Sequence, residues 1–127
     1  MAQTLEQKRA ADAWARAQGC GDEYQNLAKG LPALIMNSGL MQVMAFLEEK
    51  GSKAAQQHCR VLGQQLRDWL CERFPKELPQ RDFLSFMQCL MKAEPRVFQA
   101  ITKEAFAWLR WVRQMAPAVR ASSGQRG

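Results

Sequence analysis

Residues 94–115 read EPRVFQAITKEAFAWLRWVRQM, and this stretch indicates the fold class. Its bulky apolar residues follow one another in steps of three and four, which places them along one face of an α-helix. Glu94-Pro95 is a typical helix start, because proline is favoured in the first turn. The stretch therefore predicts a long amphipathic helix that ends before Pro117. The predicted buried positions are Phe98, Ile101, Ala105, Trp108, Val112 and Met115.

The same period of about 3.6 residues extends over the rest of the chain, and no segment shows the clean alternation of a strand. Glycines and prolines divide the pattern into six or seven helices. These are expected near residues 5–18, 22–29, 33–36, 40–50, 53–74, 81–93 and 95–115. The sequence thus predicts an all-α fold, a single-domain bundle of residues 1–117 followed by a flexible C-terminal tail, residues 118–127.

The composition suits one domain of ordinary size that stays in the cytoplasm. The chain has 127 residues, 47% of them hydrophobic, and a net charge of +6. It contains no apolar stretch of about 18 residues, and its first residues lack the apolar segment of a secretory signal, so no membrane association is expected. Its four cysteines form no C-x-x-C pair, which favours reduced thiols packed in the interior.

The sequence offers little catalytic chemistry. His58 is the only histidine, so a histidine pair for acid–base or metal chemistry cannot form. Asp68 and Glu72 are spaced to share a helix face, but they lie among arginines and lack a partner site. Glycine loops for phosphates and nucleophile motifs are missing. We expect a protein that is not an enzyme, with no cofactor, no metal and no small-molecule substrate.

The positive charge is concentrated near the C-terminus. Residues 1–95 contain 12 basic and 11 acidic side chains, whereas residues 96–127 contain six basic side chains and only Glu104 as an acid. Three of these cations recur at intervals of seven, opposite the apolar stripe, and similar rows are expected on two other helices. Such rows can follow a phosphate backbone without reading bases. The candidate residues for contact with a nucleic-acid backbone are Lys8, Arg9, Arg16, Lys53, Arg60, Arg67, Arg96, Lys103, Arg110 and Arg113.

Two aromatic residues of the last predicted helix lie outside its apolar stripe. Phe106 falls within the basic sector, and Trp111 lies near Glu104 on the helical wheel. Both are candidates for a protein interface, where aromatic side chains are enriched. Phe106 in the basic sector is also placed to stack on a nucleobase.

Residues 31–47, LPALIMNSGLMQVMAFL, carry a resemblance to a known family. Together with Arg9-Ala10-Ala11-Asp12-Ala13-Trp14 and Trp69-Leu70, this segment resembles the small α-helical fifth subunit of the type III-B CRISPR–Cas (Cmr, RAMP module) effector complex. The resemblance covers most of the chain. The block around Gly39 is its most specific part, and in this family it is expected to let helices cross closely.

The resemblance implies a non-catalytic subunit of an RNA-guided, RNA-targeting complex in antiviral defence. Its partners would be other Cmr subunits and further copies of itself, stacked into a small filament. Its basic surface would lie against the CRISPR RNA and the target RNA. The family has no rigid RNA-binding motif, so the resemblance does not select among the candidate cations.

Two other interpretations are open at this point. A helix-turn-helix DNA-binding regulator is also small, helical and basic, but it needs a polar recognition helix after a tight turn. The segment after Pro79 is too apolar for that role. An adaptor that binds only protein would account for Phe106 and Trp111, but not for the excess of positive charge.

Overall fold

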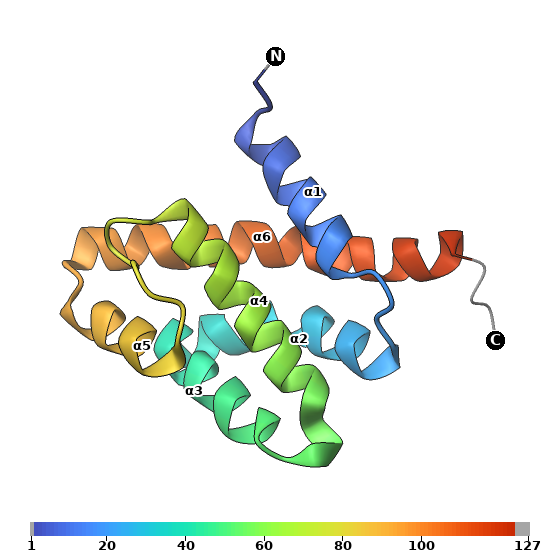
Figure 1. The fold of residues 1–127 in the computed structure, drawn as a ribbon, viewed down its shortest axis with the longest axis horizontal. Helices are drawn as coiled ribbons and strands as arrows, with labels where there is room; N and C mark the ends of the chain where they lie inside the picture. Colours follow the sequence, from blue (N-terminus) through green and yellow to red (C-terminus); the bar gives the residue numbers. More distant parts are fainter. Residues whose placement is uncertain (1, 124–127) are drawn as a thin grey trace.

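Helix α6 (Pro95–Ser122) spans the molecule, and three of the other helices contact it (Figure 1). We describe a computed structural model, which covers residues 2–123. Helices α1 and α2 both pack against α6, and α3 packs against α4. The remaining helices are α1 (Leu5–Arg16), α2 (Asp22–Ser38), α3 (Leu40–Gly51), α4 (Gln57–Arg73) and α5 (Phe83–Lys92), with a short 3-10 turn at Ala54–Gln56.

The predicted all-α fold is confirmed. Between residues 2 and 123 the chain forms six α-helices around one core and no strand. Helix α1 begins with a capping box, in which the Thr4 hydroxyl accepts from the Gln7 amide at 3.1 Å and the Gln7 side chain accepts from the Thr4 amide at 2.8 Å. The pattern of local sequence therefore locates most helices.

The predicted break after Lys29 is wrong, because α2 continues through Gly30 and Pro32 to Ser38. Glycine and proline inside a helix together cost about 4 kcal/mol relative to alanine. Against this cost, α2 buries Ala28, Leu31 and Ile35 on one face, and each large apolar side chain contributes about 1.5–3 kcal/mol when buried. Tertiary packing thus outweighs the local signals and joins two predicted helices into one.

The predicted role of Gly39 needs correction. A Cβ at Gly39 would meet nothing within 4 Å, so the residue does not let helices cross closely. It separates α2 from α3 with φ +88° and ψ 157°, a backbone conformation that only glycine adopts readily. Close crossing occurs instead at Gly51, where a Cβ would lie 2.6 Å from the backbone nitrogen of Arg60.

The last helix also extends further than predicted. Helix α6 passes through Pro117, and Ala116 and Val119 on either side of it are buried. The Arg120 guanidinium bonds to the Asp22 carboxylate at 2.6 Å and ties this end to α2. Residues 118–122, expected in the tail, are therefore helical. Residues 124–127 lie outside the described part of the chain.

The core contains most of the predicted apolar positions. Helix α6 buries Ile101, Ala105, Trp108 and Val112. Helix α4 buries Cys59, Leu62, Leu66 and Trp69. Some apolar residues of the chain stay exposed, among them Ala55, Met91 at 65% and Trp14 at 41%. Because α1 buries the small Ala13 and Ala17 against α6, its tryptophan is left at the surface.

Candidate nucleic-acid interface

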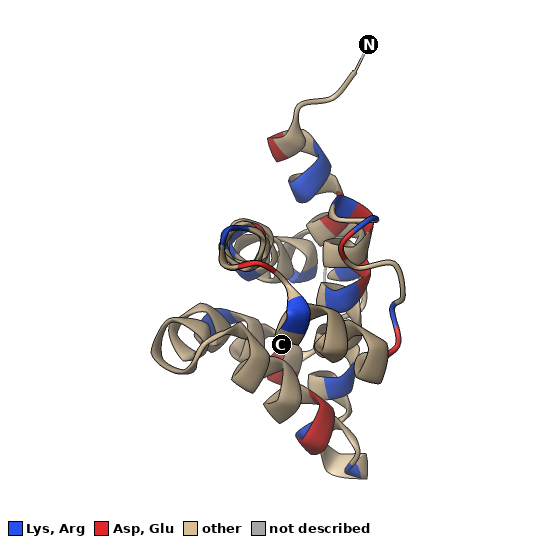
Figure 2. Ribbon diagram, turned by 90° about the vertical axis from the view of Figure 1, so that its left-hand side faces the viewer, with Lys and Arg blue, Asp and Glu red and all other residues tan. Residues whose placement is uncertain are grey.

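The exposed face of α6 carries only positive charge. Along this face, at intervals of about 10 Å, lie Arg96, Lys103 and Arg110, and Arg113 lies at its edge. All four side chains are exposed. None of the ion pairs found among residues 2–123 involves them. Figure 2, which looks nearly along α6, shows this helix beside α1, which carries residues of both charges.

The single acid of α6 does not oppose these cations, because it is buried. Glu104 is 6% exposed and accepts two hydrogen bonds from the Arg9 guanidinium, at 2.7 and 2.8 Å, and one from the Trp69 indole at 2.9 Å. Burial alone would raise the pKa of Glu104, but the bonds from Arg9 and Trp69 outweigh it and hold the pKa below its ordinary value. The carboxylate thus stays ionised and neutralises Arg9 inside the protein.

The predicted cationic row on the middle helix does not form. Lys53 precedes α4 and pairs with Glu49 at 3.4 Å. Arg67 is 9% exposed, donates through Nε to the Arg81 carbonyl at 2.9 Å, and pairs with Glu48 at 3.3 Å. Its guanidinium also lies 5.8 Å from the centre of the Phe83 ring. Arg67 therefore anchors the segment between α4 and α5 and cannot face a phosphate backbone.

The two arginines predicted to form a row on the first helix both pair with acidic side chains of the protein itself. Arg9 pairs with Glu104, and Arg16 lies 3.5 Å from Asp68 and 3.7 Å from Asp12. Both arginines are only partly exposed. Lys8 and Arg60 are exposed and are missing from the ion pairs of the described residues, so they stay in the candidate set. Of the six candidate cations that are exposed and outside these ion pairs, four therefore lie on α6.

The two off-stripe aromatics are partly buried. Phe106 and Trp111 both pack against the core from α6. Phe106 is therefore not a freely exposed platform for a base. Trp111 lies in a groove between α1 and α6, where part of its indole remains accessible.

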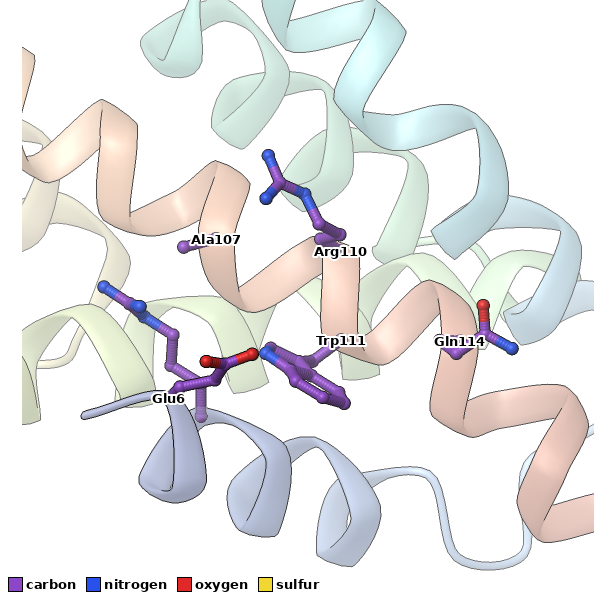
Figure 3. A pocket seen from close by; sticks show the side chains of 6 residues that line it. Glu6, Ala107, Arg110, Trp111 and Gln114 are labelled. Carbon is purple, nitrogen blue, oxygen red and sulfur yellow. The ribbon is translucent and has the colours of Figure 1, made fainter. Parts of the chain in front are cut away.

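This groove between α1 and α6 contains residues that the sequence pattern does not single out. It has a volume of about 390 Å³ and is lined by Glu6, Arg9, Ala107, Arg110, Trp111 and Gln114. Figure 3 shows Glu6 of α1 beside the Trp111 indole, while Arg110 projects from α6 away from α1. Glu6 and Gln114 have no distinctive local pattern, and only the packing of α1 on α6 brings them together.

The structure shows no arrangement typical of catalysis among residues 2–123. All four cysteines are unpaired, and burial raises the pKa of Cys71 to about 11, which makes its thiol a poor nucleophile. His58 is partly buried and lies 3.7 Å from Glu23. In the described part of the chain no three His, Cys, Asp or Glu side chains are grouped to hold a metal ion. None of the helices in that range has the apolar length that crossing a bilayer requires.

Comparison with known families agrees with this fold. A family model described as "CRISPR-associated protein (Cas_Cmr5)" matches residues 5–119, nearly the whole chain. The chain belongs to the Cmr5 family. The resemblance seen in residues 31–47 is thereby confirmed.

Relatives of the Cmr5 family in Thermus thermophilus support the assignment. The protein named "CRISPR system Cmr subunit Cmr5" is 29% identical over 105 residues, which are 83% of this chain and 81% of the relative. The crystal structure of a CRISPR-associated Cmr5 family protein from this organism superimposes with a TM-score of 0.73 at 26% identity. That superposition covers 93% of this chain and 98% of the other.

Proposed function

We propose that this Cmr5 family member is a non-catalytic subunit of a type III-B Cmr complex. It contacts the backbone of the CRISPR RNA or target RNA through the exposed face of α6, and it packs against other Cmr subunits and further copies of itself. The family assignment and the relative named as a Cmr subunit support the setting. The absence of a metal cluster or activated nucleophile among residues 2–123 is compatible with a structural role.

One observation carries the RNA contact. Arg96, Lys103, Arg110 and Arg113 are exposed on one helix whose only acid is buried and neutralised. Four cations on one face that take part in none of the ion pairs found among residues 2–123 repel one another. Binding of a polyanion relieves that repulsion and releases the counterions condensed on the polyanion. The contact is independent of base sequence because it is made with phosphates.

Packing against protein partners is supported by exposed apolar side chains. Leu84 and Met91 on α5 are 72% and 65% exposed, and their spacing of seven places them on one face of that helix. Large apolar side chains that gather on one exposed face favour contact with another protein surface. A protein-only adaptor would use this face and leave α6 unused.

The experiment is a salt titration of RNA binding by the assembled complex, with Arg96, Lys103 and Arg110 replaced together by alanine. Each phosphate contact to a single strand contributes about 0.7 to the slope of log K against log salt. In the variant the magnitude of that slope is expected to fall by about 2. Between 50 and 200 mM salt the wild type should therefore lose about 20-fold more affinity than the variant does.

A matched control removes the same charge elsewhere. Lys29, Lys76 and Lys92 are exposed and take no part in the ion pairs found among residues 2–123. Their replacement by alanine is expected to leave the slope nearly unchanged. If both triple variants change the slope equally, net charge and not the face of α6 determines binding. If neither changes it, the protein-only adaptor is the better description.

A further inference from the structure

The groove between α1 and α6 has the composition of a nucleotide site. It joins an accessible aromatic face (Trp111), an exposed cation at one edge (Arg110) and an exposed carboxylate (Glu6) within about 390 Å³. Pockets that hold small ligands range from about 300 to 1,000 Å³, so one nucleotide fits. Resting on the proposed function, we propose that this groove binds one unpaired nucleotide of the RNA that follows α6, with guanine preferred.

Continuity with the cationic face supports this assignment. Arg110 belongs both to the row on α6 and to the lining of the groove. A strand held by Arg96, Lys103 and Arg110 therefore passes the mouth of the groove, and an unstacked base can turn into it. Proteins that bind single strands combine such a backbone track with aromatic side chains on which bases stack.

Internal contacts hold the groove in place before any ligand binds. The Arg9 Nε and Nη2 atoms bond to Glu104, which fixes the α1 wall against α6. The same side of α6 is tied to α1 by the bond from the Trp108 indole to Asp12 at 2.8 Å. Because the walls are anchored by these bonds, binding a base requires little reordering of the protein.

The carboxylate provides the base preference. A carboxylate only accepts hydrogen bonds, and Figure 3 shows the Glu6 side chain beside the Trp111 indole. A base stacked on that indole would bring its edge toward Glu6. Guanine offers two adjacent N–H donors on its Watson–Crick edge, which match the two oxygens of a carboxylate. Uracil offers one N–H between two carbonyl oxygens, and these repel the carboxylate. Guanine is therefore favoured over uracil.

The test uses the full-length protein at low salt and two probes: a short single-stranded oligouridylate, and the same oligomer with one central guanosine. Anisotropy of a dye on the RNA reports binding, and quenching of tryptophan fluorescence reports stacking. Trp111→Phe is expected to abolish the quenching, and Trp111→Ala to weaken binding about tenfold. Trp14→Phe, which changes an exposed tryptophan outside the groove, is expected to retain it. Thermal melting confirms that each variant is folded.

The base preference is tested separately. The oligomer with guanosine is expected to bind about tenfold more tightly than oligouridylate, and Glu6→Gln is expected to remove most of that difference. Binding in which neither variant has these effects would overturn the nucleotide site while leaving the backbone contact on α6 intact. If neither oligomer binds, or if binding does not weaken with salt, the proposed function itself is contradicted.

Discussion

Replacing Glu104 by glutamine tests whether the buried acid holds α1 and α4 to α6. The carboxylate accepts three hydrogen bonds, two from Arg9 and one from the Trp69 indole. Glutamine keeps the shape, but it has one acceptor oxygen and presents an NH₂ group to the remaining donors. At least one buried donor therefore loses its partner, and the ion pair with Arg9 is lost as well.

The size of the effect follows from these contacts. A hydrogen bond to a charged group contributes about 1.5–3 kcal/mol, and an unpartnered buried donor adds a similar penalty. We expect Glu104→Gln to lower the free energy of unfolding by about 2–4 kcal/mol. For a chain of this size the midpoint of thermal unfolding falls by about 10 °C. Urea unfolding followed by circular dichroism measures the change directly.

The dependence on pH gives a second readout with a definite sign. The folded pKa of Glu104 lies below its ordinary value of 4.5, so the carboxylate stabilises the fold above that value. This contribution is lost as the pH falls from about 5 through the lowered folded pKa. The difference in stability between the wild type and Glu104→Gln is therefore expected to shrink over that range.

The control is Glu72→Gln, which changes an exposed carboxylate on α4 in the same way and is expected to stay within about 0.5 kcal/mol of the wild type. The reasoning is refuted if Glu104→Gln is as stable as this control. It is also refuted if the difference between Glu104→Gln and the wild type stays constant as the pH is lowered.

Further predictions concern the backbone and the thiols. Gly39→Ala should lower the free energy of unfolding by about 1–3 kcal/mol, because φ +88° with ψ 157° strains any other residue. Gly30→Ala should raise it by about 0.5–1 kcal/mol, because Gly30 lies within α2 and a Cβ there meets nothing within 4 Å. Thermal melting in which the midpoints of both variants move in the same direction would contradict this. Iodoacetamide at pH 8 should leave Cys71 unmodified in the folded protein and modify it after unfolding, because the buried thiol has a raised pKa. Mass spectrometry measures the rate of alkylation at each cysteine. If folded Cys71 is alkylated as fast as the partly exposed Cys89, the burial of Cys71 is refuted.

Much of the charge pattern on α6 can be predicted from the sequence. Residues spaced by seven on one regular helix must share a face, so the row formed by Arg96, Lys103 and Arg110 depends only on the helix itself. The same rule predicts the row that begins at Lys53. That prediction is wrong because a 3-10 turn at Ala54–Gln56 interrupts the helix on which the rule depends.

The sequence by itself determined the helical class, the positions of most helices and the exposed cations of α6, because these follow from local periodicity. Only the tertiary structure decided which charges remain available, since the partner of Arg9 lies 95 residues away and Arg67 is bound by groups on other segments. It also decided that α2 and α6 continue through Pro32 and Pro117, because the apolar surface buried there offsets the local cost of proline. Ion pairs and burial depend on the distance between segments in space, and helical periodicity carries no information about that distance.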